Sequence, residues 1–163
     1  MKIESFCYTK GATARINVCF VNEDNFGVSP ADTPESLADF WRKIVATQAD
    51  FEPEKESVIV VMLDTRLSPF AWHRVSLGTV NESSCHPREV MRPVIVSGAA
   101  GFAILHNHPS GDPSPSRGDE RITRMMVEVA KIMDIQFIDH VIVGRPAPGR
   151  ASYYSFREGG LIP

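Results

Sequence analysis

Residues 101–119, GFAILHNHPSGDPSPSRGD, pass from an apolar segment through a proline-rich loop into a segment with helical periodicity. The short apolar run before the two histidines predicts a strand over residues 101–108. The prolines, serines and glycines that follow predict a loop. Apolar side chains at helical spacing then predict a helix over residues 118–133, with one face formed by Ile122, Met125, Met126, Val129 and Met133. The stretch therefore indicates a strand, a loop and a helix in direct succession.

Strands and helices continue to alternate on both sides of this stretch. On the C-terminal side, residues 137–143 and 153–156 predict two further strands. On the N-terminal side, the run over residues 58–63 is apolar at every position, which is typical of a strand covered on both faces. Residues 72–80 predict another strand, and Pro87 begins a helix. We therefore predict an α/β fold with a mixed sheet that is layered by helices.

The first fifty residues form a separate part of this pattern. Residues 14–21 alternate enough to predict a strand, and Thr33, followed by a proline, marks the start of an amphipathic helix. Its apolar positions are Leu37, Phe40, Trp41, Ile44 and Val45. The acidic stretch DFEPEKE at residues 50–56 is the best candidate boundary. We therefore predict an N-terminal extension over residues 1–50, made of a strand plus a helix, and a main domain over residues 51–163.

Composition narrows the class of protein. The 163 residues carry a net charge of −3 without a cluster of lysines and arginines, which argues against a surface for duplex nucleic acid. Cys7, Cys19 and Cys85 form no Cys-x-x-Cys pair, which excludes a four-thiolate zinc site and a dithiol redox site. No apolar run approaches the roughly 20 residues that span a bilayer, and the N-terminus lacks a signal core. We therefore expect a cytoplasmic protein with no membrane partner.

Two histidines at the end of the predicted strand carry the candidate chemistry. Because side chains two residues apart share a face of a strand, His106 and His108 project together, with Cα atoms about 7 Å apart. Rings at that spacing can converge on one ion at about 2.0–2.1 Å from each nitrogen. Asp119, at the start of the predicted helix, can supply a carboxylate. Two histidines, one carboxylate and an open fourth position are typical of a catalytic metal, so we predict a zinc (Zn²⁺) site for metal-assisted hydrolysis.

The loop itself offers two alternatives to this ligand set. Ser116 and Asp119 match the capping pattern of a helix N-terminus, which needs no metal, although both roles can coexist. Asp112, four residues after His108, is a rival carboxylate. It stands in a Gly-Asp-Pro turn, where aspartate is favoured for turn chemistry alone. The residues by themselves leave open which carboxylate binds the ion.

A hydrolase also needs a base, and no glutamate stands beside the histidines. Glu56 comes directly before the buried strand, where partial desolvation would raise the pKa of its carboxyl towards a useful range. Its rivals are Glu54, Glu82 and Glu89. Glu56 is the best candidate for the base. Because a glutamate in an acidic connector is usually only solvated, a plain surface role for Glu56 is equally open.

The complete pattern resembles the JAMM (MPN+) metalloprotease motif, and most closely its RadC-like branch. That motif consists of an upstream glutamate, here Glu56, then His-x-His, seven residues and Ser-x-x-Asp. The resemblance extends over roughly residues 55–161 and includes HPRE at residues 86–89, HNHPSGDPSPS at residues 106–116 and IDHVIVG at residues 138–144. It is therefore supported well beyond the site itself.

This resemblance implies a JAB/MPN α/β domain, similar to the cytidine-deaminase-like class. His106, His108 and Asp119 would be the zinc ligands, and Glu56 the general acid/base. Ser116 would donate a hydrogen bond to the oxyanion of the tetrahedral intermediate. The implied activity is that of a JAMM-type zinc metallopeptidase, a hydrolase of peptide or isopeptide bonds.

Two features of the resemblance leave alternatives open. His140 follows Asp139 in a predicted strand, where it either orients a zinc ligand or is a structural strand residue. RadC-like proteins carry a DNA-repair name, and typical members have an N-terminal helix-hairpin-helix module, of which residues 1–50 show no sign. The favoured function is hydrolysis of a peptide or protein substrate, and the alternative is a non-catalytic protein- or DNA-interaction module.

Overall fold

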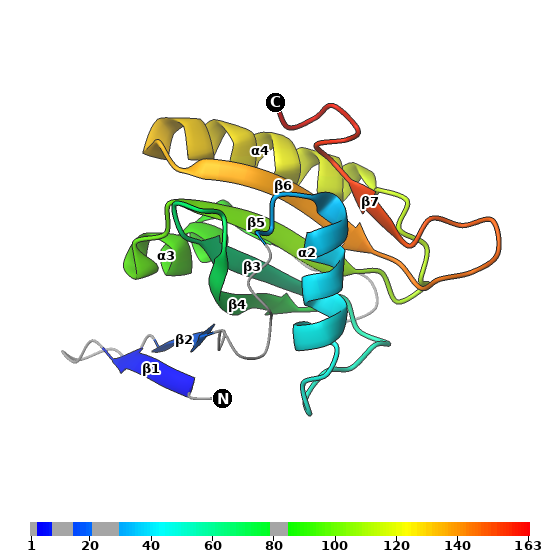
Figure 1. Cartoon of the computed structure of the whole chain (residues 1–163), viewed down its shortest axis with the longest axis horizontal. Coiled ribbons are helices and arrows are strands. Elements are labelled where there is room, and N and C mark those ends of the chain that lie inside the picture. The colour runs from blue at the N-terminus through cyan, green and yellow to red at the C-terminus, as the bar shows by residue number, and fades with distance from the viewer. Residues whose placement is uncertain (1–2, 8–14, 21–29, 79–84) are drawn as a thin grey trace.

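One mixed β-sheet runs through the described part of the chain (Figure 1). The computed structural model describes residues 3–7, 15–20, 30–78 and 85–163, the first two ranges by their backbone alone. The strand order is β1-β2-β4-β3-β5-β6-β7, and of these neighbouring pairs only β5 and β6 are parallel. The strands are β1 (Ile3–Cys7), β2 (Arg15–Phe20), β3 (Ser57–Leu63), β4 (Pro69–Leu77), β5 (Gly101–Asn107), β6 (Gln136–Val143) and β7 (Tyr153–Ser155).

Helices cover both faces of this sheet, which confirms the predicted α/β fold. α2 (Pro34–Phe40) and a π-helical turn, η1 (Trp41–Val45), pack on one face. α3 (Pro87–Ser97) and α4 (Arg117–Met133) pack on the other. In Figure 1, α2 crosses in front of the sheet, whereas α3 is seen at the left and the long α4 along the top. None of the described helices is long and apolar enough to cross a membrane.

Most element boundaries lie close to the predicted ones. Thr33 caps α2 as expected, because its side-chain oxygen accepts a hydrogen bond from the backbone N–H of Ser36 at 3.2 Å. The predicted strand over residues 14–21 corresponds to β2, and β4 begins three residues before the predicted start at residue 72. The ends of these two predictions, residues 14, 21, 79 and 80, lie outside the described ranges. β1, which pairs antiparallel with β2, was not predicted.

The central strand β3 is buried along its whole length, as its uniformly apolar sequence predicted. Because alternate side chains point to opposite faces, the strand contributes to two cores. Ile59 and Val61 pack with Leu37 beneath α2, whereas Val60 packs with Met126 beneath α3 and α4. The two apolar layers hold the sheet rigidly between its helices.

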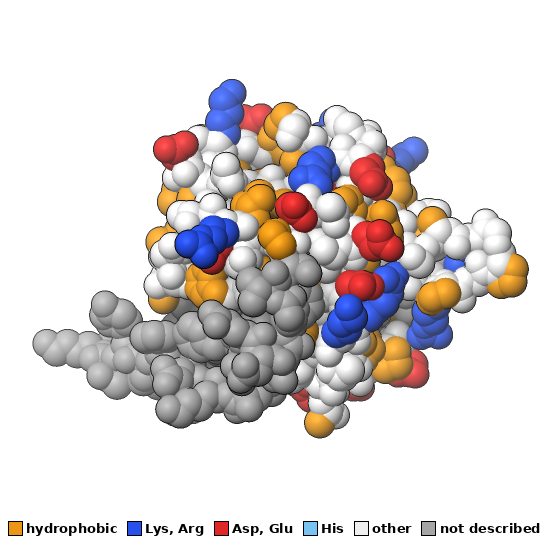
Figure 2. All heavy atoms as spheres, in the orientation of Figure 1, with side chains coloured by type: hydrophobic (Ala, Val, Ile, Leu, Met, Phe, Trp, Pro, Cys, Tyr) orange, Lys and Arg blue, Asp and Glu red, His pale blue; other side chains and the backbone are white. Residues whose placement is uncertain are grey.

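Charged side chains of both signs are interspersed over the face that Figure 2 presents. On α2 and η1, Asp39 forms ion pairs with Arg42 at 3.1 Å and with Lys43 at 3.3 Å. Exposed pairs at this spacing along a helix stabilise it by only a few tenths of a kcal/mol, roughly 0.3–0.5. The local pairing leaves this face without a continuous field of one sign.

β5, α4 and β6 form the parallel crossover unit that places the candidate site. Parallel neighbours cannot be joined by a tight turn, because the chain must return to the starting end of the sheet. After β5 the chain therefore passes through residues 108–116 and runs back along α4 before it enters β6. This path brings the N-terminus of α4 to the C-terminal end of β5, where the two histidines lie.

α2 shares its core with strands of the predicted main domain. Leu37 and Trp41 belong to the same buried cluster as Val61 of β3 and Leu105 of β5. An extension can pack in this way without being required for the fold. The predicted division at residue 50 therefore stays a prediction.

Replacing Leu37 by alanine tests whether α2 stabilises the domain. Leu37 is fully buried, so loss of its side chain should leave a cavity and lower the free energy of unfolding by about 2–5 kcal/mol. Urea denaturation followed by tryptophan fluorescence measures the change, with the exposed Glu35→Ala as matched control on the same helix. An unfolding free energy equal to that of the wild type would support an independent extension.

Candidate metal centre

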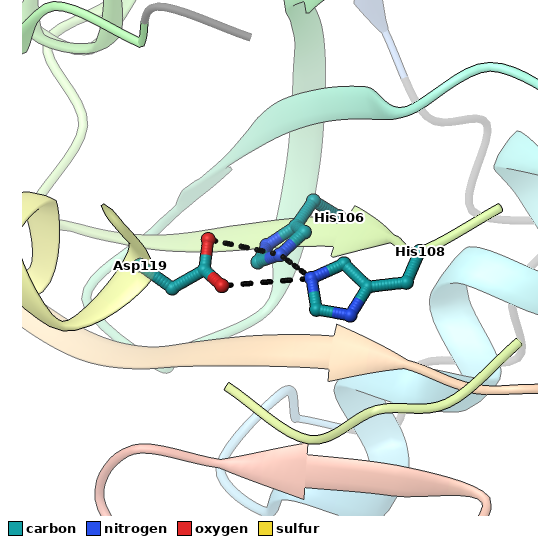
Figure 3. Close-up of side chains that lie close together, drawn as sticks. All are labelled: His106, His108 and Asp119. Carbon is teal, nitrogen blue, oxygen red and sulfur yellow. Dashed lines mark hydrogen bonds and ion pairs between the residues drawn. The ribbon is translucent and has the colours of Figure 1, made fainter. Parts of the chain in front are cut away.

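His106, His108 and Asp119 converge at the C-terminal end of β5 (Figure 3). The Nε2 atoms of His106 and His108 are 3.1 Å apart. The Asp119 carboxylate places Oδ1 at 3.3 Å from Nε2 of His106 and Oδ2 at 3.5 Å from Nε2 of His108. Ligands 2.0–2.1 Å from one ion in tetrahedral geometry are about 3.3–3.4 Å apart, so the three groups fit a shared metal without rearrangement of the backbone.

The two histidines come together at this site because they lie at the C-terminal end of β5. Both project from the face of the sheet that α3 and α4 cover, and Asn107 between them points to the other face. His106 is 1% exposed, while the side chain of His108 is 16% exposed at the rim. The site therefore has one deeply buried ligand and one that lies beside solvent.

Asp119 caps a helix and faces the histidines at the same time. Its Oδ2 accepts hydrogen bonds from the backbone N–H of Ser116 at 2.8 Å and from the Ser116 hydroxyl at 2.6 Å, which completes a capping box at the start of α4. Its Oδ1 is left towards His106. The capping role and the place in the candidate ligand set thus coexist.

Asp112 contributes its backbone to the site. Its carboxylate is exposed and accepts a hydrogen bond from the backbone N–H of Ser114 at 2.9 Å, as expected of aspartate in a turn. Its carbonyl oxygen lies 2.8 Å from Nδ1 of His108, and a carbonyl only accepts, so Nδ1 carries a proton. His108 can then offer the lone pair of Nε2 to a metal. Within the described ranges, the one group of three metal-ligand side chains is His106, His108 and Asp119.

The electrostatics of the three side chains suit a cation. Burial lowers the pKa of His106, and the negative charge of Asp119 offsets part of this effect. For His108, the hydrogen bond with Asp119 outweighs burial and raises the pKa. Burial alone would raise the pKa of Asp119, but hydrogen bonds with His108 and Ser116 and the charge of His106 hold it well below its usual range. At neutral pH the carboxylate is therefore ionised, as metal binding requires.

Glu56 lies beside the histidines on the neighbouring strand. β3 and β5 are antiparallel, and Val58 near the start of β3 pairs with His106 near the end of β5, so Glu56, just before β3, lies at the end of the sheet where the histidines lie. Its charge raises the pKa of both histidines, and its side chain is half-buried. The charge of Glu56 thus acts where the predicted base is needed, and its role as the base stays a prediction.

Asn107 holds the backbone on both sides of Glu56. Its side-chain nitrogen donates to the carbonyl of Lys55 at 3.1 Å, and its side-chain oxygen accepts from the N–H of Ser57 at 3.0 Å. The carbonyl of Glu56 itself accepts from the N–H of Gly78 at 2.8 Å. The residue between the two histidines therefore fixes the position of the candidate base, a role that the sequence did not reveal.

The rival glutamates lie in other surroundings. Glu54 is exposed, and Glu89 forms an ion pair with Arg92 on α3 at 3.2 Å. Glu82 lies outside the described residues. The thiol of Cys85 is close enough to Glu56 and Glu89 that burial and both charges raise its pKa to about 12. Of the glutamates that can be placed, Glu56 is the one whose charge acts on the histidines.

Ser116 and His140 both lie next to the ligands. The Ser116 hydroxyl donates its hydrogen to Asp119, so an oxyanion contact would require that hydroxyl to turn, and the predicted role of Ser116 stays a prediction.

His140 is buried in β6, and its Nε2 lies 2.9 Å from Nδ1 of His106. Thr123, one helical turn after Asp119, contacts His140 and was not identified from the sequence. The spacing of four residues from Asp119 is the signal that could have found it.

These elements are those of a known domain, and the chain belongs to the RadC-like JAB domain family, whose model matches residues 31–161. The family resemblance noted from the sequence is thereby confirmed. The match begins before α2 and so includes part of the predicted extension.

Relatives of this chain are proteins named UPF0758. The one from Thermotoga maritima is 42% identical over 109 residues, which cover 67% of this chain and 47% of the relative. One from Methanosarcina barkeri is 41% identical over 111 residues, covering 68% and 46%. One from Syntrophomonas wolfei is 36% identical over 134 residues, covering 82% and 53%. The chain thus spans about half the length of these relatives.

The affinity for metal should fall as the pH is lowered. The pKa of His108 is raised, so below that pKa its Nε2 carries a proton that a metal must displace. Each pH unit below it should weaken zinc binding about tenfold for this one proton, while affinity above it should level off. Competition titrations against a chromophoric chelator from pH 8 to pH 5.5 measure the profile, and the exposed His86→Gln should reproduce it. A profile flat over this range would contradict the assigned protonation state.

Proposed function

We propose that this chain is a zinc-dependent hydrolase of the JAMM type, which cleaves peptide or isopeptide bonds. The observation that carries the proposal is the spacing of the Nε2 atoms of His106 and His108 and the Asp119 carboxylate, which matches a tetrahedral metal with one position left for substrate. A closed structural site would use four protein ligands, and among the residues that the structure describes this group has three. Membership of the JAB domain family supports the same chemistry.

In this proposal His106, His108 and Asp119 would hold a Lewis-acid zinc, and Glu56 of the protein supplies the base. When bound, the ion is a Lewis acid that lowers the pKa of water to about 7 and polarises a substrate carbonyl. Glu56, which directly precedes β3 and is half-buried, takes the proton of the attacking water and then passes it to the leaving amine. Asn107 and Gly78 hold the Glu56 backbone so that its carboxylate stays in place for both transfers.

Ser116 takes a second role in this scheme. Its hydroxyl orients the Asp119 carboxylate in the structure at hand. We propose that the hydroxyl turns from Asp119 to the oxyanion as the tetrahedral intermediate forms, because charge then develops on the former carbonyl oxygen. The backbone N–H of Ser116 would keep its bond to Asp119 and hold that carboxylate meanwhile.

Replacing Glu56 by glutamine tests the proposed reaction. Glutamine keeps the shape of the side chain but cannot take up the proton, so turnover should fall about 10²- to 10⁴-fold while zinc stays bound. The measurements are cleavage of a fluorescence-quenched peptide library and of lysine-linked isopeptides, together with zinc content. Glu54→Gln, two residues away and exposed, is the matched control and should retain full activity.

The outcomes separate the proposal from a binding module. His108→Ala should lose both zinc and turnover, because it removes a ligand. If the wild-type protein holds zinc but cleaves none of these substrates and Glu56→Gln changes nothing, the non-catalytic alternative is favoured. Turnover that survives in Glu56→Gln would show that another group is the base.

A further inference from the structure

We infer that Thr123 and His140 are positioning residues, which form a hydrogen-bond relay that holds the lone pair of His106 Nε2 towards the metal position. This inference rests on the proposed metal site. The relay links four groups: the carbonyl of Asp119, the hydroxyl of Thr123, the ring of His140 and the ring of His106. The two imidazoles and the hydroxyl are all buried.

The direction of the relay is set at its first bond. Oγ1 of Thr123 lies 2.6 Å from the backbone carbonyl oxygen of Asp119, and a carbonyl oxygen has no hydrogen to give. The hydroxyl hydrogen of Thr123 must therefore lie in this bond. A hydroxyl has only one hydrogen, so towards His140, at 2.7 Å, Oγ1 is an acceptor. Nδ1 of His140 is then the donor and carries the proton of that ring.

The bond between His140 and His106 then decides which nitrogen of the His106 ring carries the proton. His140 is 1% exposed and its ring stacks on Phe156 with centroids 4.7 Å apart, surroundings that favour a ring with one proton. With that proton on Nδ1, Nε2 of His140 is an acceptor, and it lies 2.9 Å from Nδ1 of His106. Nδ1 of His106 therefore donates. The remaining nitrogen of His106, Nε2, is left with a lone pair that faces His108 and Asp119.

The relay begins and ends on the same ligand residue. The Asp119 side chain lies against His106, and the Asp119 backbone accepts from Thr123, so the four residues form a closed circuit. The orientation of the His106 ring is thereby tied to the first turns of α4, the helix that delivers the carboxylate. His108 receives the equivalent constraint separately, from the carbonyl of Asp112.

His140 is itself held in place from behind. The Asp139 carboxylate accepts from the backbone N–H of His140 at 2.7 Å, from the hydroxyl of Ser155 at 2.5 Å and from the N–H of Arg157 at 3.0 Å. These bonds join β6 to β7 and to the turn that follows. The ring of His140 therefore stays fixed in a rigid setting, as a relay requires.

Thr123→Val tests the relay, because valine keeps the shape of threonine and removes the hydroxyl. Without an acceptor at Nδ1, His140 can move its proton to Nε2 and force His106 to carry a proton on the metal-facing nitrogen. We expect zinc affinity, measured by competition with a chromophoric chelator, to fall roughly 10- to 100-fold. Thr123→Ser retains the hydroxyl and should bind zinc as the wild type does. Met126→Val, at a buried position on the same helix, controls for loss of packing.

The second measurement needs no metal. Two-bond proton–nitrogen correlation spectra of the metal-free protein report which ring nitrogen of each histidine is protonated. We expect His106 to be protonated at Nδ1 in the wild type and in Thr123→Ser, and to gain protonation at Nε2 in Thr123→Val. A Thr123→Val protein with the wild-type tautomer and affinity would overturn the relay, as would equal losses in the valine and serine variants.

The same spectra separate this inference from the proposed function. If the wild-type protein takes up no zinc, the proposed function fails. The relay is then tested only by which ring nitrogens of His106 the spectra show to be protonated in the wild type and the variants. If the wild type binds zinc while Thr123→Val and Thr123→Ser both behave like it, the relay fails and the metal site stands.

Discussion

The carboxylate of Asp119 caps a helix and faces the histidines at the same time, and the geometry of the site depends on this double contact. One oxygen caps the N-terminus of α4, where the backbone N–H groups have no partner within the helix. The other lies against His106 at the end of β5. Because the parallel pairing of β5 with β6 requires a crossover helix, the helix start and the strand end meet at one edge of the sheet. The helix cap and the candidate metal ligand are therefore parts of one arrangement.

The histidines gain their properties from where the strand ends. His106 is buried, which lowers its pKa, while the interaction with Asp119 raises the pKa of His108 at the rim. The ring of each histidine is oriented by a bond on its far side, to His140 in one case and to the Asp112 carbonyl in the other. Such bonds to the second nitrogen are what usually fixes a metal-binding imidazole.

The order of elements and the clustering of the three candidate ligands were predictable because they depend on local pattern. Period two within the strand places His106 and His108 on one face, and the capping pattern places Asp119 in the first helical turn. Glu56 could be proposed only as a residue before a buried strand, since nothing local relates it to the histidines. Its place at the end of the sheet where the histidines lie depends on the antiparallel pairing of β3 with β5.

The sequence by itself determined the alternation of strands and helices, the two-histidine pattern and the cap, because each rests on residues close together along the chain. Only the tertiary structure decided that Asn107 holds the backbone around Glu56 and that Thr123 and His140 join His106 in one chain of hydrogen bonds. The partners in these bonds are 17 to 52 residues apart. Such pairs meet only when the sheet register and the packing of α4 are set, and no local spacing encodes either.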